Sequence, residues 1–210
     1  MDRISIINEL ITKFGYKNYL EIGVDSGILI TKVNCENIVG VDPNPESKAT
    51  IHKTSDDFFA TNTMMFDICF IDGLHEHHQV YRDAINCLKF LKKGGIILFH
   101  DMMPTDELCA KVPMEVELWT GDCYHAFVQL RTERKDVEMF VIDTDWGIGF
   151  MRKGKQQLLD LKGLEINYKN FDANRKEWLN LITVAEYKHY LEHFKEPFSL
   201  GKFFSSLFSK

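Results

Sequence analysis

Short apolar runs, each closed by a turn, dominate the first half of the chain. They predict buried β-strands at residues 18–23, 37–42, 66–72 and 96–100, with a shorter strand at 50–53. Before the run at 96–100, residues 76–92 carry an apolar stripe at helical spacing, made of Val80, Ala84, Leu88 and Leu91. Gly94 and Gly95 are expected to end this helix. Strand, helix and strand at this spacing predict a right-handed βαβ unit with parallel strands.

Helical patterns fill other segments around these strands. Residues 4–14 place apolar side chains at helical spacing and stop at Gly15, and residues 123–131 form a further helix. Ser55 is in position to cap a short helix. Residues 27–33 also predict a helix, although their β-branched side chains oppose it.

Two apolar runs, residues 137–144 and 148–152, are separated by only three residues. A parallel crossover needs a dozen or more residues, so these runs predict an antiparallel hairpin. The fold is therefore expected to be α/β, with a mostly parallel sheet and an antiparallel hairpin near its C-terminal end. Residues 155–210 carry helical patterns only, and we expect them to pack as an extension on the core of residues 1–154, in a single folding unit.

The composition is that of an ordinary globular protein, with 45% of the 210 residues hydrophobic and 27% charged. The net charge of −6 disfavours a nucleic acid as partner, because nucleic-acid enzymes more often carry a basic face. No apolar run reaches the roughly 18 residues that span a bilayer, and the N-terminus has the pattern of an amphipathic helix instead of a signal peptide. The five cysteines form no Cys-x-x-Cys pair, which favours reduced thiols and a cytoplasmic location.

The C-terminal tail has an apolar face at helical spacing, made of Leu200, Phe203, Phe204, Leu207 and Phe208. We expect this face to pack on the core or in a homodimer interface. Weak contact with a membrane surface is the alternative, and there the tail's two lysines would add only a small electrostatic attraction.

Chemically distinctive residues follow the first two predicted strands, where open α/β sheets bind their ligands. Glu21, Gly23, Asp25 and Gly27 follow the first strand, and Asp42 ends the second, 19 residues after Gly23. A carboxylate at that spacing is placed to accept hydrogen bonds from two ribose hydroxyls. A dinucleotide site would have glycine at position 25, because a carboxylate there repels a pyrophosphate. Glu21 and Asp25 favour a cationic ligand, and a tight turn without any ligand is the alternative.

Five segments, in the order LEIGVDSG, VGVDP, TSDDFF, FDICFIDGLH and GGIILFHDMMP, resemble class I S-adenosylmethionine-dependent methyltransferases. Within that class they are similar to the macrocin O-methyltransferase-like bacterial subgroup, which acts on sugars and other small molecules. The resemblance covers roughly residues 15–152 and implies a Rossmann-like, doubly wound sheet of seven strands. The chain departs from the family pattern at the second glycine of the first segment.

The resemblance also implies how the cofactor S-adenosylmethionine is held. Its amino-acid end is assigned to Glu21, Gly23 and Asp25, with Asp72 close by. Its ribose is assigned to Asp42, and its adenine to Ser55 and Asp56.

Four polar residues lie at the ends of the predicted strands at 66–72 and 96–100. They are Asp72 and His75 at the first, and His100 and Asp101 at the second. Adjacent parallel strands bring them into one pocket. An alcohol that accepts a methyl group needs a general base, a metal ion or both. His75 is suited to be the base, and Asp72 and Asp101 are oxygen ligands suited to Mg²⁺. His100 stands where catechol-type enzymes have an acidic metal ligand. The alternatives are helix capping for the two aspartates and a structural role for His100.

Three other motifs favour structural interpretations. The HEHH run at 75–78 does not have the spacing of a zinc helix, so His77 and His78 are expected to face solvent. Trp119 could stack on a sugar or fill the core. Asp145 and Trp146 are expected to form a turn.

The sequence therefore favours an enzyme that methylates a hydroxyl of a sugar or other small polyol. A nitrogen acceptor, a cofactor-binding module without turnover and an NAD-linked dehydrogenase are the alternatives.

Overall fold

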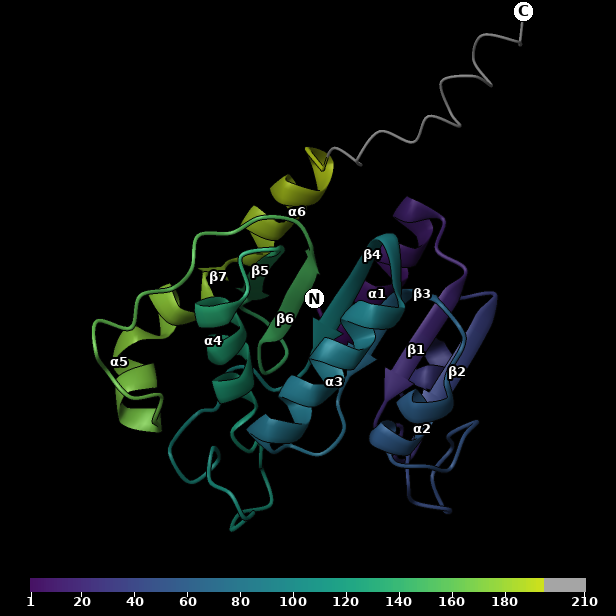
Figure 1. The fold of residues 1–210 in the computed structure, drawn as a ribbon, viewed down its shortest axis with the longest axis horizontal. Coiled ribbons are helices and arrows are strands. Elements are labelled where there is room, and N and C mark those ends of the chain that lie inside the picture. The colour runs from purple at the N-terminus through teal and green to yellow at the C-terminus, as the bar shows by residue number, and fades with distance from the viewer. Residues whose placement is uncertain (195–210) are drawn as a thin grey trace, which may run out of the picture.

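A seven-stranded sheet forms the centre of the molecule (Figure 1). The computed structural model describes residues 1–194, so the predicted apolar face at residues 200–208 lies outside the described residues. The strands are β1 (Asn18–Ile22), β2 (Asn37–Val41), β3 (Phe66–Ile71), β4 (Leu91–Phe99), β5 (Val137–Ile142), β6 (Ile148–Lys153) and β7 (Leu181–Ile182). Their spatial order is β2-β1-β3-β4-β6-β5-β7.

Most neighbouring strands run parallel. β2, β1, β3 and β4 form a continuous parallel set, and β7 is parallel to β5. β6 is antiparallel to both β4 and β5. The predicted mixed sheet with an antiparallel hairpin is confirmed.

Helices cover both faces of the sheet (Figure 1). They are α1 (Arg3–Phe14), α2 (Ser55–Thr61), α3 (His77–Phe90), α4 (Cys123–Glu133), α5 (Tyr168–Leu179) and α6 (Val184–Glu192). Residues of α2, α3, α4 and α5 share one core cluster, whereas those of α1 and α6 share the other. The sheet is therefore the middle of three layers.

Alternate residues of the central strands supply the two core clusters. In β3, Cys69 and Ile71 belong to the cluster with α3, and Ile68 and Phe70 belong to the cluster with α1. This is the period-2 alternation of a strand. Because both faces are covered, apolar side chains dominate the strands on both faces, which explains the mainly apolar runs in the sequence.

Several predicted elements differ from the structure. Residues 27–33 form only a short 3₁₀ turn at Ile30–Lys32, which suits their β-branched side chains. Residues 50–53 contribute one bridge, between Ile51 and Val41, and no strand. The cap of α2 is Thr54, whose Oγ1 accepts a hydrogen bond from the Asp57 amide at 3.1 Å, and Ser55 is the first helical residue.

Two further boundaries depend on tertiary pairing. α3 ends at Phe90, and the chain enters β4 directly at Leu91, before the glycines predicted to stop the helix. The C-terminal segment is also not wholly helical, because Leu181 and Ile182 pair with β5 and extend the sheet. No helix within residues 1–194 has both the length and the apolar character needed to cross a bilayer.

Candidate active site

A cavity of about 720 Å³ lies at the carboxyl ends of β1, β2 and β3. Its size is within the usual range for small-molecule sites. The predicted site residues on its wall are Glu21, Gly23, Asp25, Asp42, Ser55, Asp56, Asp72 and His75. The wall also contains Asp83 and a single arginine, Arg3, which the sequence did not indicate. A wall with this excess of carboxylates favours a ligand that carries positive charge.

Asp42 fixes the loop that follows β1. Its Oδ2 accepts hydrogen bonds from the Val24 and Asp25 amides at 3.0 and 2.9 Å, and its Oδ1 accepts one from the Asn44 amide at 2.8 Å. Each carboxylate oxygen has further lone pairs, so the side chain can also accept a hydroxyl from the cavity. Asp42 therefore has a structural task besides its predicted contact with a ribose.

Gly23 lies against the backbone that follows β3, where there is no room for a side chain. Its φ is +84°, and a Cβ there would lie 2.0 Å from the Asp72 carbonyl oxygen. The loops after β1 and β3 are therefore packed backbone to backbone. The sequence predicted that this glycine lets a ligand approach, and the residue does line the cavity. The close packing of the two loops is a second reason for glycine, which the sequence did not indicate.

Glu21 is a buried carboxyl group at the base of the cavity. The Tyr19 hydroxyl donates a hydrogen bond of 2.6 Å to its Oε2. Burial raises the pKa of Glu21 to about 8, and nearby Asp72 adds to the rise, while Tyr19 and Arg3 oppose it. A cationic group bound beside Glu21 would favour its ionised form.

The α2 side of the cavity combines Ser55 and Asp56 with residues of α3. Gln79 donates hydrogen bonds to Ser55 Oγ at 3.0 Å and to Asp83 Oδ1 at 3.1 Å. Burial raises the pKa of Asp83 to about 6. Asp56 is exposed and lies 3.3 Å from Arg82.

The four predicted catalytic residues form one alternating cluster, here called the His–Asp cluster (Asp72, His75, His100 and Asp101). His75 Nε2 lies 3.4 Å from Asp72 and 3.3 Å from Asp101. His100 Nδ1 lies 3.3 Å from Asp72 and 3.1 Å from Asp101. Each carboxylate thus faces both imidazoles. Asp101 is held at a φ of +62°, an uncommon conformation for a residue other than glycine.

Opposite charges set the pKa values of this cluster. Burial raises the pKa of Asp72, but hydrogen bonds from His100 and His75 outweigh it and bring the value to about 2. Burial lowers the pKa of His75, whereas Asp72 and Asp101 raise it, with a net increase. Asp72 is therefore ionised at neutral pH, and His75 is a stronger base than a free imidazole.

Arg3 and Asp145 complete the far side of the cluster. Arg3 Nη1 lies 2.9 Å from Asp145 Oδ1 and 2.6 Å from His100 Nε2. His100 Nε2 also lies 3.5 Å from Asp145 Oδ1, so three carboxylates surround this imidazole. Burial lowers the pKa of His100, but hydrogen bonds to Asp101, Asp145 and Asp72 outweigh it and raise the pKa to about 11, so the ring is a cation at neutral pH.

His75 has one nitrogen without a partner. Its Nδ1 is buried and has no partner at hydrogen-bond geometry among the described residues, although the backbone of Trp119 lies near enough to raise the pKa of the ring. The ring of Trp119 packs against the imidazole, with the ring centroids 5.2 Å apart. Trp119 thus lies beside the predicted base and is only partly buried.

The ligand atoms of Asp72, His75 and Asp101 lie within 4.8 Å of one another, as a metal site requires. Two of these residues belong to the predicted metal set, but the third place is taken by His75 instead of His100. His100 and Asp101 are also absent from the cavity wall that the described residues form.

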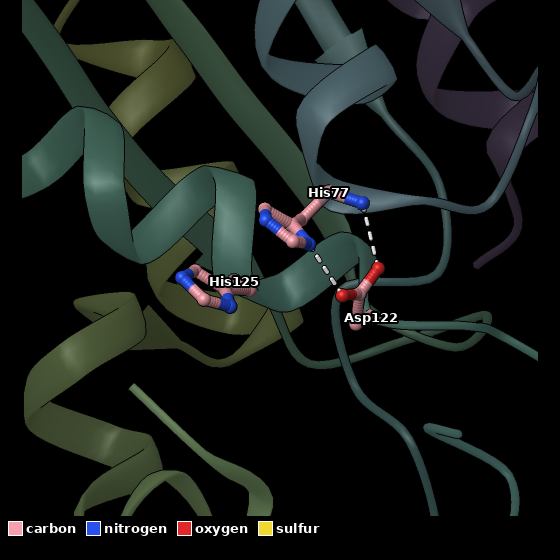
Figure 2. Close-up of side chains that lie close together, drawn as sticks. All are labelled: His77, Asp122 and His125. Carbon is pink, nitrogen blue, oxygen red and sulfur yellow. Dashed lines mark hydrogen bonds and ion pairs between the residues drawn. The ribbon is translucent and has the colours of Figure 1, made fainter. Parts of the chain in front are cut away.

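The sequence missed two residues of this region and misplaced a third. Arg3 and Asp145 are 142 positions apart, and no local pattern indicates that they meet. Asp145 does lie in the predicted turn, at a φ of +45°. His77 was expected to face solvent, yet it is half-buried and bound to Asp122, with its ring stacked on His125 (Figure 2). His78 is exposed as expected.

Residues 20–102 match the family model of a methyltransferase domain. The match covers less than half of the 210 residues. This segment runs from β1 to just beyond β4, so it contains nearly the whole cavity wall and all of the His–Asp cluster. The protein is thus an enzyme of the methyltransferase kind. No curated protein matches the sequence.

Solved structures share the fold of this methyltransferase. The SAH-bound methyltransferase of Podospora anserina is 16% identical, with a TM-score of 0.58 over 73% of this chain and 78% of its own. The SAH complex of a Bacillus cereus O-methyltransferase has 16% identity and a TM-score of 0.51 over 71% and 78%. The SAM complex of TomG, an O-methyltransferase of Streptomyces achromogenes, has 16% identity and a TM-score of 0.52 over 71% and 77%. The Rossmann-like methyltransferase fold is confirmed, and the macrocin-like subgroup stays a prediction.

Proposed function

We propose that this protein transfers the methyl group of S-adenosylmethionine (SAM) to a hydroxyl group of a small molecule. The observation that carries the proposal is an acidic cavity at the strand ends that adjoins a base-containing His–Asp cluster. The O-methyltransferases of the same fold that bind SAM or S-adenosylhomocysteine (SAH) support it.

The cavity wall matches the chemical groups of SAM. Glu21 and Asp25 face its cationic amino-acid end, and Asp42 accepts the ribose hydroxyls. Ser55 and Asp56 lie on the wall where the adenine is expected. Arg3 is the only lysine or arginine among the described wall residues, and we assign it to the carboxylate of SAM. A phosphate-containing cofactor would meet repulsion from the carboxylates on this wall, at Asp25, Asp42, Asp56 and Asp72.

The His–Asp cluster supplies acceptor activation. When bound, SAM presents a carbon already activated by its positive sulfur, so the protein has to position the acceptor and remove its proton. Asp72 and Asp101 hold His75 through Nε2, which leaves the unpartnered Nδ1 to accept the hydroxyl proton. His100 and Arg3 balance the charge of the two carboxylates.

A divalent ion is a second way to activate the hydroxyl, and we propose Asp72 and Asp101 as its ligands with a third from His75 or His100. The ligand atoms of Asp72, His75 and Asp101 lie close enough to converge on one ion. An ion there would act as a Lewis acid toward the acceptor oxygen. If His75 binds it, another group has to take the proton, so metal assistance and the His75 base can be separated by experiment.

The acceptor class follows from the surface beside His75. Trp119 offers a partly buried aromatic face, which suits the apolar face of a sugar ring or other polyol. Leu74, Leu108 and Leu118 are exposed on the cavity rim or in the segment that precedes Trp119. These apolar residues favour, as a second candidate, a phenolic acceptor with an apolar body.

The test is an SAH-production assay with labelled SAM, run against a panel of sugars, polyols, phenols and amines, with and without EDTA. We expect turnover with a hydroxyl acceptor. Turnover with amines alone would replace the proposal by N-methylation. SAM binding without any turnover across the panel would favour a binding module. Loss of turnover in EDTA, restored by Mg²⁺, would identify the metal route.

A further inference from the structure

Outside the cavity, the structure brings together a second group of histidine and carboxylate side chains, here called the interhelix site (His77, Asp122 and His125). One ligand atom from each residue lies within 4.8 Å of the other two. His77 is the first residue of α3, Asp122 is the N-cap of α4, and His125 lies in the first turn of α4. His77 lies 45 residues before Asp122, and the spacing matches no zinc motif. Only the packing of α3 against α4 reveals the site.

The carboxylate of Asp122 is already oriented toward His77. Its Oδ1 accepts a hydrogen bond of 2.6 Å from the His77 amide, and its Oδ2 lies 2.5 Å from His77 Nδ1. Figure 2 shows both contacts as dashed lines, with the ring of His125 next to that of His77. The two rings are stacked, with centroids 4.2 Å apart and planes at 8°. The amide contact fixes the carboxylate without involving Oδ2, as outer contacts do in metal sites.

His125 is available as a ligand. Its imidazole makes no hydrogen bond among the described residues and is only partly buried, so an ion can reach it from solvent. Burial and the neighbouring His77 lower the pKa of His125, although Asp122 opposes this. A neutral imidazole is the form that binds metals.

We propose that the interhelix site binds one divalent transition-metal ion of the Zn²⁺ class, which fastens the N-terminus of α3 to that of α4. Two imidazoles and one carboxylate suit Zn²⁺, Ni²⁺ or Co²⁺ better than Mg²⁺ or Ca²⁺, which prefer oxygen ligands. The ion replaces the proton between His77 and Asp122, and that proton leaves to solvent. Water fills the remaining coordination position.

The required rearrangement is small. In a tetrahedral zinc site, ligand atoms lie roughly 3.3 Å apart, so His77 and Asp122 separate slightly and the stacked rings tilt toward one point. The positive ends of two helices weaken cation binding here, and the Asp122 carboxylate offsets this effect.

The ion would also brace the region around His75. A Cβ on Gly121 would lie 1.9 Å from the His75 carbonyl oxygen, so the chain entering α4 already touches the loop that carries the proposed base. A metal bridge from His77 to α4 would restrict the motion of this loop relative to α4. The metal is therefore structural, and its binding does not depend on the proposed methyl transfer.

The test is calorimetric titration of the metal-free protein with Zn²⁺, together with melting curves. The variants are His77→Ala and His125→Ala, and His78→Ala is the matched control because His78 is the exposed neighbour outside the site. Asp101→Asn reports on the group at Asp72, His75 and Asp101, and His193→Ala reports on the exposed group at His189, Glu192 and His193. We expect one equivalent that binds with micromolar or tighter affinity and with proton release in wild type, and that is kept in His78→Ala, Asp101→Asn and His193→Ala. We also expect Tm to rise by roughly 5 °C at saturation.

Both site variants should lose this binding. If one of them is unfolded without metal, His125→Gln replaces it, since the amide keeps the size of the ring without being a good zinc ligand. Binding that survives in His125→Ala and His77→Ala but disappears in Asp101→Asn would overturn the proposal. So would the absence of Zn²⁺ binding in wild type, which would leave a hydrogen-bonded link between two helices only.

Discussion

The two halves of the proposed active site are held by different kinds of interaction. On the cofactor side, backbone amides bind Asp42, and Gly23 packs against the backbone of the next loop. On the acceptor side, ionised side chains hold one another in the His–Asp cluster. Arg3, assigned to the cofactor, contacts this cluster from the N-terminal helix and links the two sides. The first half therefore depends on backbone shape, and the second depends on charge.

This difference predicts how each half responds to substitution. A change on the cofactor side should affect folding and cofactor binding together, because the same atoms serve both. A change on the acceptor side should affect turnover with little loss of cofactor affinity. The predictions below run from the largest expected effect to the smallest.

His75→Ala should lower kcat about 10³-fold with the acceptor found in the hydroxyl screen, because the general base is removed. SAH affinity should stay within about twofold of wild type, since that residue sits at the acceptor end. Steady-state kinetics and calorimetry measure the two quantities. The exposed His78→Ala is the control, and an equal loss of SAH affinity in His75→Ala would argue against separate halves.

Gly23→Ala should destabilise the fold by about 2–3 kcal/mol more than Gly163→Ala, as read from denaturant unfolding. Both glycines have φ near +80°, so both variants carry similar backbone strain. Only at Gly23 would the new Cβ meet another atom, whereas nothing lies within 4 Å at Gly163. Equal effects would show that the two loops are not tightly packed.

SAH affinity should rise with pH up to about 8 because of Glu21. Burial raises the pKa of this carboxyl to about 8 in the free protein, and the ligand ammonium favours the ionised form. The bound-state pKa is therefore lower, a proton is released on binding, and affinity increases by roughly tenfold per unit between pH 6 and pH 8. Calorimetry across this range should show the slope in wild type and a flat profile in Glu21→Gln. A flat wild-type profile would remove Glu21 from the cofactor contact.

Arg3→Ala should weaken SAH binding by about fivefold, the effect expected of one half-exposed ion pair. Binding of 5′-methylthioadenosine, which lacks the amino-acid end, should not change. Lys17→Ala is the control, because Lys17 pairs with Glu36 on the surface outside the cavity. Equal weakening of both ligands would place Arg3 in a general structural role.

The sequence was sufficient to predict those elements that depend on interactions between residues close together along the chain. Apolar runs closed by Gly and Asp predicted β1, β2 and β3, and a three-residue connection required the hairpin of β5 and β6. The cavity residues could be found because they follow those strands directly. Glycine and aspartate at strand ends are strong local signals.

Long-range contacts account for what the sequence did not show. The meeting of Arg3 with Asp145, and of His77 with His125, depends on how helices pack over the sheet. β7 has only two residues, and its pairing with β5 gives no pattern that a sequence can reveal. Charged side chains that meet across the fold leave no periodicity, so the contacts of Arg3 and Asp145 with the His–Asp cluster were visible only in the structure.

The most direct test of the central claim is calorimetric titration with SAH of wild type, Asp42→Ala and Asp160→Ala. Asp42 lies on the cavity wall, whereas Asp160 bonds only within its own exposed loop. The account predicts micromolar binding in wild type and Asp160→Ala, and a loss of about 100-fold or more in Asp42→Ala, with the fold intact by circular dichroism. Absence of SAH binding in folded wild-type protein, or equal affinity in folded Asp42→Ala, would contradict it.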